Sequence, residues 1–599
     1  GLGYDSQITS ETYDRRKLYH AYLNSYLSKK TEENPDFVHQ LTVRSYELED
    51  MLIAFCDQLY NRSVDIKDLN VEVLGNSIGS MPYFNELIKE VVIPAEIQYA
   101  SDIRANNLIS LRDCMISIHR LVKEGKISGI GLNFKYLFID EFQDTDDVQI
   151  ETVLGLQKIF GNDCHLFIVG DLKQSIYRFR GATLSAFTKV EKDNSLWEKY
   201  SLNRNYRTDG RLLDIFDAVF SEMNSGKLLP YKESDHLVSR VVKECETDQL
   251  VRKIETNGKD KDKFFEDLFK EVEYQKKEIE RIRKDSKLSK EEMTIAILVR
   301  YNYQITNIVK AAEKVGLTVK VSEGGDLFRL TSTIDLYKLV LAITHPYNKV
   351  YLANFLESNY VSMKLQQVRL KGCNDKEKIS ELVRILDEYF MLLLGKRWGE
   401  IIADFETRPV LVVLREIYET SKPWITYSSN LDYQLEYRAN YECLMEKITQ
   451  KYSREYLTVN LVDSYLKINI TTYQEEASRK KELDSNEVTV LCTTIHKSKG
   501  LEYGTVIMPY TSDDISSTYH LGIGVNVVDG KLIYSYGAGN GNMDYSEGYQ
   551  VDFESFESEC EEARILYVAM TRAIRNFVWF KDLDGKAEDC WGNLLEVIE

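Results

Sequence analysis

The sequence predicts an α/β protein with two parallel-sheet domains, each carrying a mainly helical insertion. Three observations support this fold class. Short continuous apolar runs end in acidic residues or glycine, the segments between them have helical spacing, and two longer stretches are helical throughout. Apolar runs that end in this way and alternate with helices are typical of parallel sheets covered on both faces.

The N-terminal part, residues 1–130, has the apolar spacing of helices. Tyr13, Tyr19, Tyr22 and Tyr26 recur at helical intervals, and we expect the face they form to belong to a core. No chemistry is expected from it.

Two apolar runs follow and predict the strands of a first sheet. The run Tyr136–Ile139 ends in Asp140-Glu141, and the run Leu166–Val169 ends in Gly170-Asp171, with a helix between them. Strands joined through a helix run parallel, so both runs deliver their polar ends to the same edge.

The remaining segments predict a second sheet. A charged segment at 253–292 has apolar residues three and four apart, which favours an amphipathic helix. Residues 346–480 return to helical spacing. Strands are expected at Ile295–Val299, Val488–Cys492, Thr505–Met508 and Phe577–Phe580, with a helix at 559–573.

Composition excludes several classes of protein. The chain has 599 residues, 43% of them hydrophobic and 29% charged, with few Gly and Pro, so collagen-like and wholly disordered classes are excluded. The net charge of −19 repels phosphate, so a nucleic acid would need a local basic groove.

The same composition bears on compartment and metal sites. The nine Cys form no CxxC pair and the eight His are scattered, which favours a reducing compartment without structural zinc. The sequence has no long apolar run and no leader peptide pattern, and we expect a cytoplasmic protein that does not enter a membrane.

The first chemical motif is Phe138-Ile139-Asp140-Glu141-Phe142-Gln143-Asp144-Thr145. Ligands of open α/β folds bind at the carboxyl edge of the sheet, where a buried strand delivers two adjacent carboxylates. Asp140 could hold Mg²⁺ and Glu141 could activate water for phosphoryl transfer. The alternative is an acidic strand end that faces solvent.

The second motif begins at Gly170 and follows the next strand. Gln174 could sense a terminal phosphate without carrying charge. Tyr177 and Phe179 alternate with Arg178 and Arg180, a combination that suits single-stranded nucleic acid because aromatic faces stack on bases and guanidinium groups pair with the backbone. The alternative is a core aromatic pair flanked by surface arginines.

These segments, together with Leu202–Thr208, resemble motifs II, III and IV of the UvrD/Rep-like superfamily 1 DNA helicases. Thr494–Tyr503 resembles motif V and Glu562–Ala573 resembles motif VI. The five motifs occur in the family's order between residues 136 and 575. The form Lys497-Ser498-Lys499-Gly500 is closest to the RecB/AddA branch.

The resemblance implies roles for residues around a nucleotide. Asp140 would bind Mg²⁺, Glu141 would activate the hydrolytic water, and Gln174 would contact the γ-phosphate or that water. On the other side of the cleft, Tyr206 would stack on adenine and Glu502 would accept a hydrogen bond from the ribose. Two arginine fingers complete the set, Arg207 and Arg572.

The resemblance also implies a track for single-stranded DNA. Phe179 would stack on a base, and Arg180, Thr494 and His496 would line the track. Each role has a structural alternative. Tyr206 could be a core residue, the arginines could pair with carboxylates, and His496 could be an ordinary hydrogen-bonding histidine.

The same resemblance divides the chain into two RecA-like motor domains with insertions. The expected parts are a helical 1B-like insertion at 1–105, the first motor domain at 106–198, the start of the second motor domain at 199–345, a 2B-like helical insertion at 346–480, and the rest of the second motor domain at 481–599.

One expected element is missing from the sequence. A motor of this kind needs a phosphate cradle of the form G-x-x-x-x-G-K-[ST]. Gly75–Ser80 lacks the lysine, and Gly125–Ser128 lacks the spacing. Either the cradle lies upstream of Gly1, which the absence of an initiator methionine favours, or this is a helicase-like protein that does not hold ATP.

The sequence therefore predicts an ATP- and Mg²⁺-dependent DNA helicase or translocase that moves 3′ to 5′ on single-stranded DNA. Its partners would be single strands, single-strand/duplex junctions, and a nuclease or repair protein. The alternative is a non-hydrolysing, helicase-like scaffold that binds DNA or anchors a nuclease partner. A third hypothesis, an ATP-dependent switch acting on a protein, rests only on the net charge. The pathway stays open among repair, recombination and defence against foreign DNA.

Overall fold

The computed structural model divides the chain into two compact units, Gly1–Ser322 with Ser485–Glu599, and Glu323–Asp484. The structure describes residues 7–9, 13–37, 43–62, 64–66, 69, 77–79, 83–106, 108–127, 134–161, 163–177, 190, 197–239, 250–257, 260–285, 287–321, 327–364, 374–453, 456–471, 487–515, 521–528, 531–539, 542–546, 551–585, 587 and 589–598.

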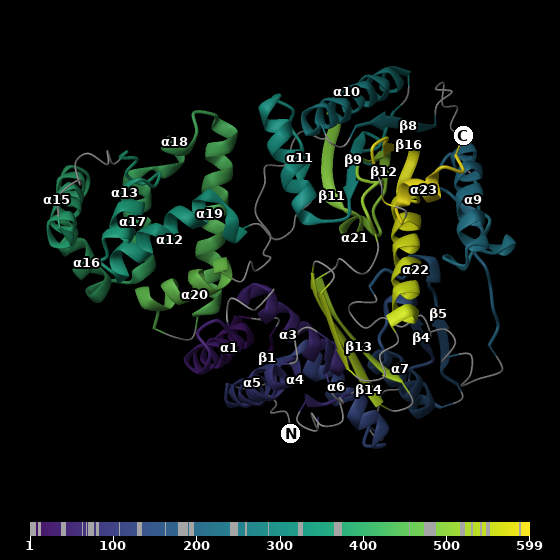
Figure 1. Ribbon diagram of the computed structural model, residues 1–599, viewed down its shortest axis with the longest axis horizontal. Helices are drawn as coiled ribbons and strands as arrows, with labels where there is room; N and C mark the ends of the chain where they lie inside the picture. The colour runs from purple at the N-terminus through teal and green to yellow at the C-terminus, as the bar shows by residue number, and fades with distance from the viewer. Residues whose placement is uncertain are drawn as a thin grey trace. The chain divides into compact units, whose positions relative to one another are not determined.

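The largest described sheet of the first unit has six strands and lies between α10 (Lys261–Asp285) and α22 (Val551–Met570) in Figure 1. All its neighbouring strands pair in parallel, in the order β10-β11-β9-β12-β16-β8. The strands are β8 (Val251–Thr256), β9 (Thr294–Val299), β10 (Lys320–Val321), β11 (Thr489–Thr494), β12 (Tyr503–Met508) and β16 (Ala573–Asp582). The predicted α/β class with parallel sheets is confirmed. Strands β8 and β10 were not predicted, and β8 occupies the start of a segment expected to be helical.

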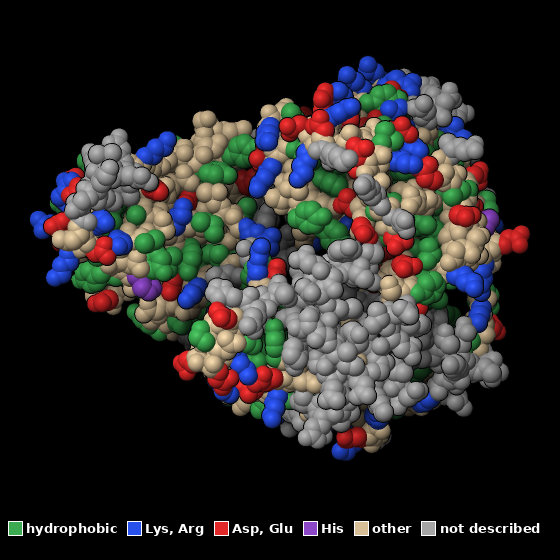
Figure 2. Space-filling model, in the orientation of Figure 1, with side chains coloured by type: hydrophobic (Ala, Val, Ile, Leu, Met, Phe, Trp, Pro, Cys, Tyr) green, Lys and Arg blue, Asp and Glu red, His purple; other side chains and the backbone are tan. Residues whose placement is uncertain are grey.

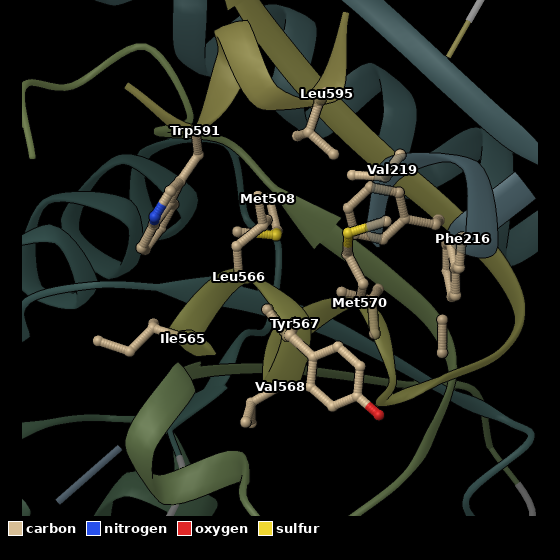
Figure 3. Close-up of a cluster of buried hydrophobic side chains, with 14 of the residues drawn as sticks. Phe216, Val219, Met508, Ile565, Leu566, Tyr567, Val568, Met570, Trp591 and Leu595 are labelled. Carbon is tan, nitrogen blue, oxygen red and sulfur yellow. The ribbon is translucent and has the colours of Figure 1, made fainter. Parts of the chain in front are cut away.

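Side-chain alternation along the central strands explains why both faces of this sheet are covered. On β9, Ala296 and Leu298 enter one apolar cluster, whereas Ile295, Ile297 and Val299 enter another on the opposite face. The first cluster packs under α9 (Gly210–Ser225), α22 and α23 (Trp591–Leu595), as Figure 3 shows. The second packs under α10 and α11 (Asn302–Lys314).

The amphipathic helix expected in the charged segment is α10. Its sequence intersperses basic and acidic residues on the solvent side, and the mixture of both charges over this helix is visible in Figure 2. On the opposite side of the same helix, Leu268 and Val272, one helical turn apart, are fully buried. The charge of this helix is therefore a solvated face rather than a basic patch.

The other predicted sheet contains β4 (Tyr136–Ile139) and β5 (His165–Ile168), which pair in parallel. Helix α7 (Asp147–Phe160) joins them and begins with a capping box in which Asp146 accepts from the N–H of Gln149. Helix α6 (Leu111–Lys123) packs beside α7. On the opposite side of the strands, Tyr136, Phe138 and Phe167 have exposed fractions of 56%, 74% and 47%.

The first 110 residues are mainly helical where the structure describes them, as expected. Their elements are β1 (Gln7–Thr9), α1 (Tyr13–Glu33), α3 (Ser45–Asn61), α4 (Phe84–Leu87), the π-helical turn η3 (Ile88–Val92), α5 (Ile93–Ala105) and β3 (Leu108–Ser110). Tyr13, Tyr19 and Tyr26 are buried in their core. The short strands β1 and β3 pair in parallel and were not predicted.

A second sheet on these helices comes from a distant part of the sequence. Strands β13 (Leu521–Val528), β14 (Lys531–Gly539) and β15 (Asn542–Ser546) form an antiparallel meander, and β15 pairs with β2 (Ser77–Gly79). In Figure 1 the meander lies beside α3. The sequence prediction for 481–599 contains none of these strands. The signal was Asp529-Gly530 between two β-rich runs, a pair typical of hairpin turns.

The second unit is helical throughout its described residues. Its helices are η8 (Leu327–Arg329), α12 (Thr331–Thr344), α13 (Lys349–Leu356), α15 (Asp375–Leu394), α16 (Trp398–Thr407), α17 (Val410–Ser421), α18 (Pro423–Tyr427), α19 (Leu431–Lys451) and α20 (Val459–Thr471). Aromatic stacking fills the core, with the rings of Tyr418 and Tyr441 3.5 Å apart. Across the described parts of both units, no helix combines the length and apolarity needed to span a membrane.

Candidate functional site

The two carboxylates predicted to do chemistry lie at a sharp turn after β4. Glu141 has φ of 51°, in the left-handed region that non-glycine residues rarely adopt. Its N–H donates to Oδ1 of Asp140 at 2.9 Å, and the next N–H, of Phe142, donates to the carbonyl of Val169 at 2.9 Å. Both Asp140 and Glu141 are exposed, so the turn presents two carboxylates to solvent at the carboxyl edge of the sheet.

A buried glutamine connects this turn to the loop after β5. Gln143, which is 1% exposed, donates from Nε2 to Oε2 of Glu141, and its Oε1 accepts from the N–H of Asp171 at 2.9 Å. The hydroxyl of Ser175 donates to the Gln143 carbonyl at 3.2 Å. Gln143 thus uses both ends of its amide to fix the carboxylate of Glu141 relative to the second motif.

Gln174 lies in that second loop and is half-buried. Its Nε2 donates to Oδ2 of Asp171 at 3.1 Å. The same carboxylate pairs with Lys173 at 2.8 Å and accepts from the hydroxyl of Tyr567, on α22, at 3.3 Å. Asp171 therefore gathers contacts from its own loop and from the C-terminal part of the chain.

Tyr206 and Arg207 are held by a tight turn after Asn205. Oδ1 of Asn205 accepts from the N–H of Arg207 at 2.7 Å and from that of Thr208 at 2.9 Å. Tyr206 has 70% of its surface exposed, so it is not a core residue. The Arg207 guanidinium forms an ion pair with Glu502, so two residues expected to touch opposite parts of a nucleotide contact each other.

Arg572 is close enough to Arg207 to interact with its charge, and it is 3% exposed. It donates to the carbonyls of Val568 and Leu501, each at 3.0 Å. Burial, with the nearby charge of Arg207 as the second cause, lowers the pKa of Arg572 to about 10, whereas the carboxylate of Glu141 acts in the opposite direction. Two neighbouring guanidinium groups, one of them buried, form a place that favours an anion.

Of the residues expected on the DNA track, the structure describes Thr494 and His496. Thr494 is 7% exposed, and its Oγ1 accepts from the N–H of Lys497 at the start of α21 (Ile495–Ser498). The ring of His496 lies 6.0 Å from that of Tyr177, whose hydroxyl donates to the His496 carbonyl at 3.2 Å. Phe179 and Arg180 lie outside the described residues.

Comparison with known families then identifies the chain. The profile of the UvrD/REP helicase N-terminal domain matches residues 5–195, and that of the UvrD-like helicase C-terminal domain matches residues 200–579. The chain belongs to the UvrD-like helicase family. The family recognised from five motifs is therefore confirmed, and its RecA-like fold agrees with the parallel sheets.

Three similar proteins are named as components of an ATP-dependent helicase/nuclease. They come from Staphylococcus aureus strains JH9, Mu3 / ATCC 700698 and NCTC 8325 / PS 47. Each is 25% identical to this UvrD-like helicase over 488 residues, which cover 74% of this chain and 38% of the relative. The chain thus matches under two-fifths of the length of these relatives. That the relatives are helicase/nuclease subunits agrees with the expected RecB/AddA branch.

The UvrD-like helicase brings its predicted residues together in two groups. Asp140, Glu141 and Gln174 come from the N-terminal region (residues 5–195). Gln143 connects Glu141 to Asp171, which accepts from Gln174, and Asp140 accepts from the Glu141 N–H. The group from the C-terminal region (residues 200–579) consists of Tyr206, Arg207, Glu502 and Arg572. The electrostatic interaction between Glu141 and Arg572 joins the two groups.

The carboxylates of this site also fit the metal that the family uses. Within the described part of the chain, no three His, Cys, Asp or Glu residues group as a metal site. Mg²⁺ in nucleotide sites is bound by one or two carboxylates together with substrate phosphates, so it needs no such group. The exposed carboxylate of Asp140, whose Oδ1 accepts from the Glu141 N–H, suits this mode of binding.

Gln143 and Asp171, which organise the two motifs, were not expected to have a role, and Lys499 was expected only as part of motif V. The signal that could have indicated their roles was a polar side chain at each of these positions. Gln143 and Asp171 stand in the short turns after β4 and β5, and Lys499 directly follows α21; a polar side chain that becomes buried at such a place needs a partner.

Proposed function

We propose that this chain forms the motor of an ATP-dependent DNA helicase or translocase that moves 3′ to 5′ on single-stranded DNA. The observation that carries the proposal is that Arg572, from the C-terminal region, interacts electrostatically both with Arg207 and with the Glu141 carboxylate of the N-terminal region. A pair of neighbouring guanidinium groups, one of which interacts with a carboxylate of the other region, suits charge development on a transferring phosphate.

In this function the residues of the two groups divide the work. Asp140 would hold Mg²⁺, Glu141 would orient and deprotonate the attacking water, and Gln174 would contact the terminal phosphate. Tyr206, with its exposed ring, would stack on adenine, and Glu502 would accept from the ribose. Bound Mg²⁺ would neutralise charge on the phosphate oxygens.

The DNA track is proposed on the second motif and on motif V. Tyr177 and His496 already contact each other, which supports a common surface formed by the two segments. Phe179 and Arg180 would supply stacking and backbone contacts, and Thr494 would position the turn that carries His496. Because the chain carries a net charge of −19, binding would depend on these local cations and weaken steeply with salt.

The phosphate cradle is proposed to come from a segment of the natural protein outside these residues. The support is the aromatic face of β4 and β5, where Phe138 and Phe167 stack 5.0 Å apart while remaining 74% and 47% exposed. Parallel sheets are normally covered on both faces. A strand, Gly-rich loop and helix would cover these rings and place a lysine near Asp140.

The test is ATP hydrolysis by the 599-residue chain beside a version extended to the natural start, each with and without single-stranded DNA. We expect only the extended chain to turn over ATP, with stimulation by DNA. Glu141→Gln in the extended chain should retain nucleotide binding and lose turnover. Unchanged turnover in that variant would refute the catalytic assignment.

The second candidate is a non-hydrolysing scaffold that anchors a nuclease partner. The relatives are named as components of a helicase/nuclease, which supports a nuclease as a partner of this chain. If neither version hydrolyses ATP although both bind single-stranded DNA, the scaffold replaces the motor. If neither binds DNA and an ATP-dependent protein contact is found, the third hypothesis gains support.

A further inference from the structure

Lys499 is a buried cation that joins the two helicase regions. It follows α21 in the C-terminal region, and its side chain is 8% exposed. Its ammonium lies 2.7 and 2.6 Å from the two carboxylate oxygens of Asp144 and donates to the Gln174 carbonyl at 2.7 Å. All three acceptor oxygens belong to the N-terminal region, and the three donors of an ammonium match three acceptors.

The partners of Lys499 belong to two motifs that Gln143 also connects. Asp144 ends the turn that begins at Glu141, and Gln174 lies in the loop after β5. The ammonium also lies 5.0 Å from the ring centroid of Tyr177, a favourable cation–π distance. One side chain of motif V therefore contacts the carboxylate turn, the phosphate-sensing loop and the aromatic residue that touches His496.

That loop is also held from α22, through one main-chain and one side-chain contact. Nε of Arg564 donates to the Ser175 carbonyl at 2.8 Å, and the Tyr567 hydroxyl donates to Asp171 at 3.3 Å. These two contacts reach only the loop after β5. Lys499 differs from them because it also reaches Asp144, and through that turn the residue expected to activate water.

We propose that Lys499 is a positioning residue that couples DNA binding on motif V to the nucleotide site, by holding the Asp144 turn and the Gln174 loop in one arrangement. This inference rests on the proposed function for the identity of the two ligands. Any shift of α21 that accompanies DNA binding would move the ammonium and both of its attachments together. Two sites coupled in this way change each other's affinity by the same factor.

The test uses the chain extended to its natural start, with oligothymidylate and a non-hydrolysable ATP analogue as probes. The coupling factor is the ratio of DNA affinities with and without the analogue. Couplings between sites amount to about 5- to 150-fold, and we expect Lys499→Met to lower the factor at least about fivefold. Nucleotide affinity without DNA should change less than about threefold, because Lys499 is not expected to touch the nucleotide.

Lys253→Met is the matched control. Lys253 also contacts both oxygens of one carboxylate, that of Glu596, at 3.2 and 3.1 Å, and its ammonium lies 5.3 Å from the ring centroid of Trp579. All three of these residues lie outside the N-terminal region, so this variant removes a lysine–carboxylate pair with a nearby aromatic ring, in which the Lys253 side chain is 31% exposed, and leaves the contacts between the two regions in place. The coupling factor should stay at the wild-type value.

The double variant Lys499→Met with Asp144→Asn separates positioning from stability. Removing one partner of a buried ion pair destabilises a protein because the other charge is left behind, and removing both relieves that cost. We expect the thermal midpoint to recover in the double variant while coupling stays lost. Recovery of coupling together with stability would mean that Lys499 only stabilises the fold, and the proposal would fail.

The wild-type chain separates this inference from the proposed function. If the wild type couples DNA and nucleotide binding but does not hydrolyse ATP, the motor proposal fails and the Lys499 proposal is tested unchanged. If the wild type hydrolyses ATP without any coupling between the two ligands, the Lys499 proposal is overturned and the motor stands.

Discussion

Arg207 forms an ion pair with Glu502, and the two side chains are 35% and 38% exposed. Ion pairs at such exposure contribute about 0–1 kcal/mol, because solvent screens them and ordering two long side chains costs entropy. A triphosphate carries more charge than one carboxylate and can therefore compete for the guanidinium. The pair keeps Arg207 beside Arg572 while leaving it available to a nucleotide.

The first prediction separates the two members of this pair. Arg207→Gln in the upstream-extended chain should lower kcat by about 10³-fold or more, the usual effect of losing an arginine finger. Glu502→Gln should raise KM for ATP less than about tenfold and leave kcat nearly unchanged, because the exposed pair contributes little. Steady-state ATP hydrolysis with saturating single-stranded DNA measures both. A large fall of kcat in Glu502→Gln would show that the pair itself is required in the transition state.

The second prediction concerns Gln143, the buried link between Glu141 and Asp171. Gln143→Leu keeps the volume but leaves the Asp171 N–H without its acceptor, which should cost about 1–3 kcal/mol of unfolding free energy. The same change releases the carboxylate of Glu141, so kcat should fall as well. Denaturant unfolding and ATP turnover measure the two effects.

Glu141→Gln is the control for Gln143, because Glu141 is exposed and the amide can still contact its neighbour. It should lose turnover with a change in unfolding free energy within about 0.5 kcal/mol. If Gln143→Leu is as stable as the wild type, the hydrogen bonds of Gln143 are not what holds the two motifs together.

Much of the fold could be predicted because the central strands are buried on both faces. The runs at β9 and β12 differ from their observed bounds by at most two residues at either end, since a strand covered on both sides has no polar positions that interrupt it. The run at β4 has its observed bounds because it is apolar throughout, although Phe138 is 74% exposed. Strands β2 and β8 were missed because they are short or lie at the edge of a sheet, and their pairing partners are far away in the sequence. Strands β13 to β15 pair as consecutive hairpins, and the turn signal at Asp529-Gly530 was not used.

The candidate site also has a part that could be predicted from the sequence and a part that could not. Motif residues such as Asp140 and Arg207 could be named because resemblance to a family fixes them one by one. The ion pair of Arg207 with Glu502 and the contact of Lys499 with Asp144 could not be predicted, because each joins residues about 300 or more positions apart. Only the folded arrangement brings such side chains within hydrogen-bond distance.

The third prediction tests the attachment of the β13–β15 meander to the N-terminal helices. Gln58, which is 4% exposed, donates from Nε2 to the Ile523 carbonyl at 2.7 Å and accepts from the N–H of Val525 at 2.8 Å. Gln58→Leu leaves two buried backbone groups of β13 without partners and should cost about 2 kcal/mol. Hydrogen exchange should also accelerate at β13.

The matched control for Gln58 is Gln98→Leu, which removes an exposed hydrogen bond of 2.8 Å to Asp102 on α5. Surface changes of this kind stay within about 0.5 kcal/mol. If both variants lose the same small amount of stability, the meander is held by its apolar contacts, those of Tyr534 with Phe55 and Phe84, rather than by Gln58.

The fourth prediction follows from the buried charge of Arg572, whose pKa burial lowers to about 10. The unfolded chain binds this proton more tightly, so the charged group opposes folding below pH 10, and the penalty is relieved only as pH rises from about 10 towards the ordinary arginine value. Arg572→Met should therefore be at least as stable as the wild type, by a margin that stays constant between about pH 6 and 9, while ATP turnover falls by about 10³-fold. Unfolding free energies at several pH values measure the margin. A loss of more than about 2 kcal/mol would show that the bonds of Arg572 to Val568 and Leu501 outweigh its desolvation.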